Sequence, residues 1–244
     1  MLGTDLSSPS AVWAPPQSAA AEAARARLSG TIWQRSDLAL FAYRAFFSLG
    51  AALGRAGVSA NALTYASLVF AATSCIAAAR GYFAPAALAL IVGGLCDALD
   101  GVVARTTGTV SRYGALLDST VDRVSDTLPL LGILVFHAHE PLLAIIPGLA
   151  LIGAMVIPYA RARTEALGGT LPSLFMRRPE RVVLLVVCLL LGGWHAPLGA
   201  PAALLLVGTT LLAVLNAIGG VLVLRAAERA LEGAPVPERS LRHP

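Results

Sequence analysis

The sequence predicts an all-α integral membrane protein with six transmembrane helices and one N-terminal amphipathic helix at the membrane interface. Of the 244 residues, 57% are hydrophobic and only 13% are charged, and the mean hydropathy is +0.74. Apolar runs of about 20 residues, the length that crosses a bilayer, recur along the chain. Arginines gather between these runs in an asymmetric pattern. This composition excludes a soluble globular domain.

The N-terminal region is expected to lie outside the membrane core. Residues 1–30 are rich in Ala, Ser and Pro and predict a disordered cytoplasmic tail without a cleavable signal peptide. Residues 31–58 predict a juxtamembrane amphipathic helix, with Ser36 as its N-cap. Apolar residues recur there at helical spacing, interrupted by Arg44 and Arg55. The alternative is that this segment begins a longer spanning helix.

Six transmembrane helices are expected within residues 59–229. The first four apolar runs are 60–79, 84–107, 113–136 and 141–162. Residues 182–224 carry no charge over a length that is too great for one span and suits two. Gly192–Gly193 and Pro197 to Pro201 predict the turn between these two spans. Residues 230–244 are expected to form a cytoplasmic C-terminal tail.

The arginines predict the orientation of these spans. All 18 basic residues are arginine, and with the N-terminus inside the cell the predicted outer turns carry only Arg80. This positive-inside asymmetry places both termini in the cytoplasm and indicates a multi-pass protein of the inner (plasma) membrane. The net charge of +4 suits anionic membrane lipid. No nucleic-acid partner is expected, because the arginines do not form one soluble basic patch.

Two pairs of carboxylates are the strongest functional signal. Asp97 and Asp100 lie near the end of the second span, and Asp118 and Asp122 lie near the start of the third. Spacings of three and four residues place each pair on one helix face, at the cytoplasmic end. Four uncompensated charges in a membrane would be very costly, and oxygen-rich sites suit Mg²⁺ or Mn²⁺. The sequence therefore predicts a metal site, with structural ion pairs to nearby arginines as the alternative. The arginines considered for such pairs are Arg105, Arg112 and Arg123.

Small residues and one arginine accompany the carboxylates. Gly101 and Ala104 remove side-chain bulk beside the first pair, and Gly114 does so before the second, so that a ligand can approach the backbone. Arg105 carries a permanent charge on a forked group that suits a diphosphate. Together these residues predict a polar pocket for a phosphorylated ligand.

The complete string D-x2-D-G-x2-A-R-x8-G-x3-D-x3-D resembles the signature of the CDP-alcohol phosphatidyltransferase family. The resemblance implies that the four aspartates ligate two divalent metal ions, with Asp122 also acting as general base. It implies that Gly101, Ala104, Arg105 and Gly114 bind the CDP-lipid, CDP-diacylglycerol. The reaction would transfer a phosphatidyl group to a small polar alcohol and release CMP. The family plan also implies six spans, an interfacial helix and a homodimer.

A second segment bears on the acceptor alcohol. The pieces R-A-R-x-E and R-P-E-R resemble the members of this family in actinobacteria and archaea that use inositol phosphate. By this resemblance Arg161, Arg163 and Arg181 are candidate acceptor contacts, since arginine clusters hold phosphate. Ordinary positive-inside flanking is the alternative for these arginines. Inositol phosphate is the favoured acceptor, and glycerol phosphate, free inositol and other small alcohols are alternatives.

Two other classes of membrane protein use intramembrane carboxylates. An intramembrane prenyltransferase would have its two Asp motifs far apart in sequence, whereas Asp100 and Asp118 are close here. A cation transporter would more often show broken helices or an internal repeat near the bilayer midplane. The Gly-x2-Ala-Arg insert has no evident purpose in transport, so the sequence favours the phosphatidyltransferase.

Overall fold

A computed structural model describes residues 37–172, 175–195 and 203–232 of the protein. The described residues form α-helices joined by short connections, with no β-strand among them. The helices are α2 (Asp37–Arg55), α3 (Ala60–Ala79), α4 (Phe83–Thr107), α5 (Arg112–Phe136), α6 (Pro141–Ala166), α7 (Arg178–His195) and α8 (Ala203–Leu231). The all-helical class is therefore confirmed, whereas the expected tail over residues 1–30 and the Ser36 cap lie outside the described residues.

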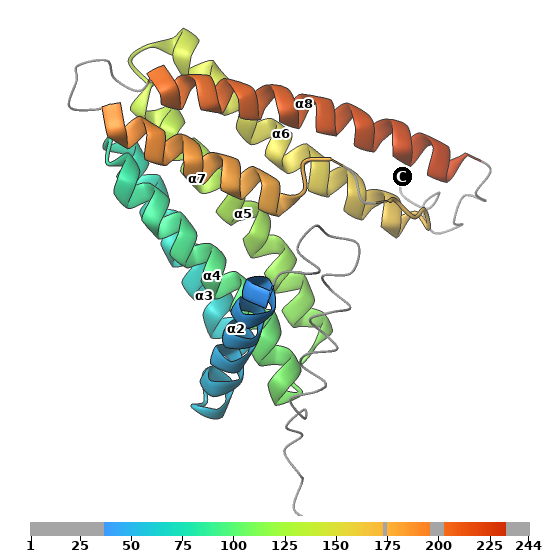
Figure 1. Ribbon diagram of the computed structural model, residues 1–244. Coiled ribbons are helices and arrows are strands. Elements are labelled where there is room, and N and C mark those ends of the chain that lie inside the picture. The colour runs from blue at the N-terminus through green and yellow to red at the C-terminus, as the bar shows by residue number, and fades with distance from the viewer. Residues whose placement is uncertain (1–36, 173–174, 196–202, 233–244) are drawn as a thin grey trace, which may run out of the picture. The chain divides into compact units, whose positions relative to one another are not determined.

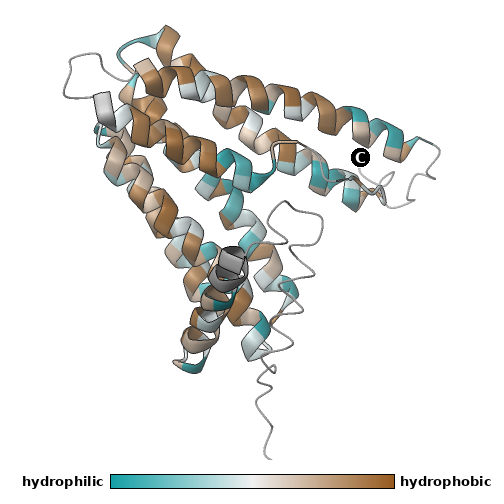
Figure 2. Ribbon diagram, viewed as in Figure 1, coloured by the Kyte–Doolittle hydropathy of each residue, from teal (hydrophilic) through white to brown (hydrophobic). Residues whose placement is uncertain are grey.

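Four of these helices, α3, α4, α6 and α8, are long and apolar enough to cross a membrane. The protein is a multi-pass membrane protein on this evidence. Large apolar side chains on these helices point away from the protein, as Leu88 (63% exposed) and Leu142 (81% exposed) do. Exposure of that extent along whole helices suits contact with lipid rather than with water. Helices α5 and α7 occupy the other predicted spans and are more polar at one end (Figure 2).

The prediction that Gly192–Gly193 take part in the turn before the last span is wrong, and the other part of that turn, Pro197 to Pro201, lies outside the described residues. Both glycines lie inside α7, which continues to His195. A Cβ atom on Gly192 would lie 3.0 Å from the Cβ of Leu205, and one on Gly193 would lie 3.2 Å from the backbone nitrogen of Ala84. The glycines therefore serve close packing of α7 against its neighbours and not chain reversal.

The chain divides into two compact units, which are described separately. The first unit is Met1–Tyr65 with Cys96–Asp118, and the second is Ala66–Leu95 with Ser119–Pro244. In the first unit α2 packs against the C-terminal half of α4 through two glycines. A Cβ atom on Gly50 would lie 2.5 Å from Val102, and one on Gly54 would lie 2.8 Å from Thr107. This spacing of small residues lets two helix backbones approach closely.

The second unit holds the main apolar core. In it α8 packs along both α6 and α7 (Figure 1), and buried leucines such as Leu189 and Leu212 fill the space between helices. One buried polar side chain crosses this layer: Asn216 of α8 donates a hydrogen bond from Nδ2 to the carbonyl oxygen of Ala150 on α6, at 2.9 Å. Gly153 makes room for it, because a Cβ atom there would lie 2.5 Å from the Cβ of Asn216.

Three helices of the second unit, α6, α7 and α8, each have one polar end. The C-terminal turns of α6 and α8 and the N-terminal turn of α7 are hydrophilic, while the rest of these helices is hydrophobic (Figure 2). The C-terminal ends of α6 and α8 lie together, since a Cβ atom on Gly169, just after α6, would lie 3.1 Å from Leu231. Helix α7 begins instead beside the middle of α8, where a Cβ atom on Gly219 would lie 3.3 Å from that of Met176, so the three polar ends are not all adjacent (Figure 1). They carry the arginines that the sequence analysis assigned to the cytoplasmic side.

Candidate metal centre and active site

Three of the four predicted metal ligands converge in the first unit. One carboxylate oxygen from each of Asp97, Asp100 and Asp118 lies within 4.8 Å of the other two. Asp97 and Asp100 come from one face of α4, and Asp118 comes from the second turn of α5. Because three carboxylate oxygens at this separation can share one divalent cation, the donors fit Mg²⁺ or Mn²⁺.

A threonine that the sequence analysis did not identify orients this cluster. Thr64 on α3 donates a hydrogen bond from its hydroxyl to Oδ2 of Asp100 over 2.6 Å. Both residues are buried, with 3% of Thr64 and 6% of Asp100 exposed. A hydrogen bond to one oxygen of a carboxylate fixes the orientation of that carboxylate. Thr64 therefore prepares Asp100 to coordinate metal. No spacing rule connects residues 36 positions apart, so the sequence carried no signal for this contact.

The short connection between α4 and α5 sets the position of Asp118. Gly108 adopts a φ of +69°, the left-handed conformation that favours glycine at a helix C-terminus. Ser111 then caps α5, because its hydroxyl accepts a hydrogen bond from the backbone nitrogen of Gly114 at 2.9 Å. A Cβ atom on Gly114 would lie 3.0 Å from the Ser111 hydroxyl oxygen, so the glycine keeps this cap unobstructed.

The predicted CDP-lipid contacts on α4 lie beside the carboxylates. A Cβ atom on Gly101 would lie 3.1 Å from Nη1 of Arg105, so the guanidinium group lies directly over the glycine. Ala104 is partly buried, and Arg105 is exposed at the end of α4. The glycine thus leaves room for the Arg105 side chain to fold back along α4 toward Gly101. A permanent positive charge there is suited to a diphosphate.

Asp122, the fourth predicted ligand, lies one turn beyond Asp118 on α5 and belongs to the second unit. Its Oδ1 forms an ion pair with Nη1 of Arg178 at 2.7 Å, and both side chains are about one quarter exposed (26% and 27%). The sequence analysis considered pairs with arginines near in sequence. The partner instead comes from the N-terminus of α7. Arg123, one of the arginines it considered, donates to the carbonyl and hydroxyl oxygens of Ser119.

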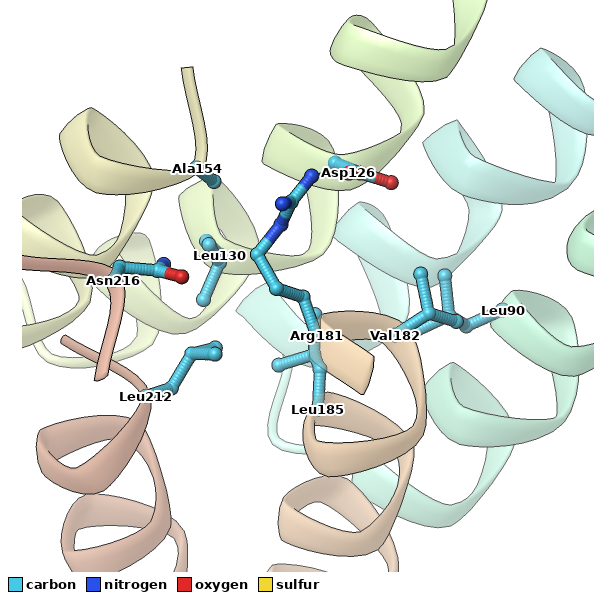
Figure 3. Close-up of a pocket in the computed structure, with 9 residues that line it drawn as sticks. All are labelled: Leu90, Asp126, Leu130, Ala154, Arg181, Val182, Leu185, Leu212 and Asn216. Carbon is cyan, nitrogen blue, oxygen red and sulfur yellow. Dashed lines mark hydrogen bonds and ion pairs between the residues drawn. The ribbon is translucent and has the colours of Figure 1, made fainter. Parts of the chain in front are cut away.

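Asp126, a further turn along α5, is buried and accepts from two arginines. Nε of Arg178 donates to its Oδ1 at 3.1 Å, and Nη2 of Arg181 donates to its Oδ2 at 2.8 Å. Figure 3 shows Arg181 extending from α7 toward Asp126, in a small cavity also lined by Asn216. The sequence indicates Asp126 only through its spacing, because a residue four positions after Asp122 lies on the same face of the helix.

The three arginines predicted to contact the acceptor differ in their burial and in the hydrogen bonds that they form within the protein. Arg181 is 6% exposed and donates from Nη1 to the carbonyl oxygen of Met176 at 2.8 Å, in addition to its bond with Asp126. Arg161 is only partly buried and donates to the carbonyl oxygen of Pro172 at 3.0 Å. Arg163 is exposed. The buried Arg181 therefore has a structural role in the described state.

A sequence comparison decides the family. The CDP-alcohol phosphatidyltransferase family matches residues 57–224, which is more than half of the chain. The protein belongs to the CDP-alcohol phosphatidyltransferases. It is therefore an enzyme of phospholipid synthesis, and the prenyltransferase and transporter alternatives are set aside.

Relatives with names are found in archaea and actinobacteria. The chain is 36% identical over 143 residues to an archaetidylinositol phosphate synthase of Pyrococcus horikoshii, covering 57% of this chain and 73% of that protein. It is 40% identical over 95 residues to a phosphatidylinositol phosphate synthase of Mycobacterium tuberculosis, covering 38% of this chain and 44% of that protein. The aligned part thus spans less than half of the mycobacterial relative.

Solved structures of the mycobacterial enzyme have the same fold. The crystal structure with CDP-DAG bound superposes with a TM-score of 0.70 at 29% identity, covering 80% of this chain and 98% of that chain. The structure in complex with manganese and citrate gives a TM-score of 0.70 at 28% identity, covering 79% and 93%. The similarity therefore extends well beyond the Asp-containing segment.

Proposed function

We propose that this enzyme transfers a phosphatidyl group from CDP-diacylglycerol to the hydroxyl of inositol phosphate and releases CMP. The convergence of Asp97, Asp100 and Asp118 carries the proposal, because three carboxylates that could hold a divalent cation lie within the segment that matches the family. Relatives named for inositol phosphate lipids support the acceptor. Glycerol phosphate, free inositol and other small alcohols are alternative acceptors.

The four aspartates would hold two divalent metal ions, Mg²⁺ or Mn²⁺. The donor set fits, since it consists of hard oxygen atoms and since Thr64 holds Asp100 in place. When bound, the ions would neutralise the diphosphate of the CDP-lipid and stabilise the leaving CMP. Asp122 extends the set by one helical turn from Asp118.

Asp122 would also be the general base. A carboxylate can accept the proton from the attacking hydroxyl when it lies within hydrogen-bond reach of it. The side chain of Asp122 is 26% exposed, so a substrate can reach it. Asp100 in contrast is only 6% exposed, which suits a ligand that binds metal alone.

Four residues would bind the CDP moiety: Gly101, Ala104, Arg105 and Gly114. Arg105 would pair with the diphosphate through its exposed guanidinium group. Gly101 and Ala104 keep side chains away from the backbone of α4, and Gly114 does the same at the start of α5. The role of these residues is to orient the lipid diphosphate for displacement of CMP.

Arg161, Arg163 and Arg181 are the proposed acceptor contacts. The first two have exposed guanidinium surface at the end of α6 and can reach a phosphate in solution. Arg181 is held by Asp126 and by the carbonyl oxygen of Met176, so it would contact the acceptor only by exchanging one of these partners. Arg161 and Arg163 are therefore the direct contacts that we favour.

We propose a membrane arrangement to match this chemistry. Helices α5 and α7 would complete six spans within residues 59–229, and α2 would lie in the interface, within the juxtamembrane segment 31–58. Both termini and the active site would face the cytoplasm of the inner membrane, where the soluble acceptor and CMP are exchanged. Two chains would form a homodimer, as the family implies.

The proposal is tested by CMP release from the purified full-length protein. CDP-diacylglycerol and Mn²⁺ or Mg²⁺ are supplied with inositol phosphate, inositol, glycerol phosphate or serine in parallel reactions. Release that requires both metal and inositol phosphate is expected. Release with a different alcohol would correct the acceptor, and the absence of metal-dependent release with every alcohol would contradict the proposed reaction.

A further inference from the structure

The ion pair between Asp122 and Arg178 belongs to a cluster that contains Asp126 and Arg181 as well. Arg178 contacts both aspartates, with Nη1 on Asp122 at 2.7 Å and Nε on Asp126 at 3.1 Å. Asp126 divides its two oxygens between two arginines, since Oδ2 accepts from Arg181 at 2.8 Å. Two carboxylates therefore face two guanidinium groups, and the charges of these four groups cancel.

The two ends of this cluster differ in burial. Asp126 and Arg181 have side chains that are 6% and 7% exposed, so each charge is stabilised there by its oppositely charged partner. The side chains of Asp122 and Arg178 are about one quarter exposed, although Oδ1 of Asp122 is itself buried beneath the guanidinium group. Asp126 thus anchors both arginines, and the contact between Arg178 and Asp122 is the one that another cation could replace.

A divalent cation that binds Oδ1 of Asp122 would compete with Arg178 for the same oxygen. The guanidinium nitrogen lies 2.7 Å from the carboxylate oxygen, and a metal ion bound to that carboxylate would repel it at close range. We propose that Arg178 is a positioning residue that holds Asp122 in the metal-free enzyme, is anchored by Asp126, and is displaced from Asp122 when metal binds. This inference rests on the metal-ligand role proposed for Asp122 above.

If Arg178 competes with metal for Asp122, its removal should change the metal affinity in the opposite direction to the removal of a purely structural arginine. Removing Arg178 removes the cation that metal must displace, so metal should bind more tightly. Loss of a merely structural arginine would instead disturb the site and weaken metal binding. Loss of a partly exposed ion pair such as that between Asp122 and Arg178 should change the dissociation constant for metal by about five-fold.

The test is a Mn²⁺ titration of the purified full-length protein, followed by the electron paramagnetic resonance signal of free Mn²⁺. Arg178→Gln is compared with Arg177→Gln as a matched control. Arg177 is the neighbouring arginine, and its Nε forms an exposed ion pair with Oε1 of Glu180 at 3.6 Å. We expect a dissociation constant about five-fold lower for R178Q than for the wild type. R177Q should stay near the wild-type value.

A milder variant keeps the test decisive if R178Q does not fold. Arg178→Lys retains the charge, but its single ammonium group cannot hold Asp122 and Asp126 together as the fork does. Its Mn²⁺ affinity should fall between those of the wild type and R178Q. Affinity in R178K or R178Q that equals R177Q, or is weaker than the wild type, would overturn the proposal.

The titration needs neither substrate, so its result is separable from the proposed reaction. Mn²⁺ competition without CMP release would reject the proposed reaction and support the role of Arg178. A wild-type protein that binds no Mn²⁺ would overturn both the metal role of the aspartates and this inference.

Discussion

Replacing Thr64 by valine tests how the metal centre is oriented. Valine matches the shape of threonine but cannot donate the 2.6 Å hydrogen bond to Asp100. The exposures of 3% and 6% leave little access for a water molecule to replace the hydroxyl. A hydrogen bond to a charged group contributes about 1.5–3 kcal/mol, so we expect the metal-free protein to lose about that much stability. Loss of such a supporting contact typically weakens metal binding by about 10–100-fold.

The assay is a Mn²⁺ titration of the variant, combined with CMP release at low and saturating Mn²⁺. The dissociation constant should rise, and high metal should restore most of the rate. Thr73→Val is the matched control, because Thr73 is on the same helix and its hydroxyl bonds only its own helix, at the carbonyl oxygen of Val69. A folded T64V protein with wild-type Mn²⁺ affinity would refute the reasoning that Thr64 orients Asp100.

Three further predictions address the base, the acceptor and the packing. Asp122→Asn should lower CMP release by at least about 10²-fold while CDP-lipid binding is partly retained; loss of nucleotide and metal binding without a selective effect on turnover would argue against a base. Arg161→Ala should raise the KM for inositol phosphate more than that for CDP-diacylglycerol in steady-state assays, and equal increases would remove it from the acceptor pocket. Gly153→Ala should destabilise the protein by about 1–3 kcal/mol in thermal unfolding, because its Cβ would lie 2.5 Å from that of Asn216. Gly94→Ala, where a Cβ meets nothing within 4 Å, is the control and should not destabilise.

Much of the fold was predictable because a bilayer imposes a local, one-dimensional constraint. A span must be an apolar run of about 20 residues, and the runs at 60–79 and 113–136 correspond closely to α3 and α5. The error at Gly192–Gly193 arises because the use of a glycine depends on tertiary packing and not on a local constraint. Glycine marks a turn in many sequences, but inside a membrane helix it also permits close packing, and only the neighbouring helices decide between these uses.

The candidate site divides in the same way. Helical periodicity alone placed Asp97 and Asp100 on one face of α4, and the motif spacing brought Asp118 toward them across a short connection. The ion pairs of Asp126 with Arg178 and Arg181 join residues 52 and 55 positions apart. Such partners are selected by how α7 packs beside α5, which no local pattern encodes.

The sequence by itself therefore determined the membrane class, the all-helical fold and the family of chemistry, since each depends on composition or on spacing within a few turns. The tertiary structure decided which charges neutralise one another. It gave Asp100 the hydroxyl of Thr64, and it gave Asp122 the guanidinium group of Arg178. The physical reason is that a buried charge takes whichever partner the packing brings within hydrogen-bond distance, regardless of separation along the chain.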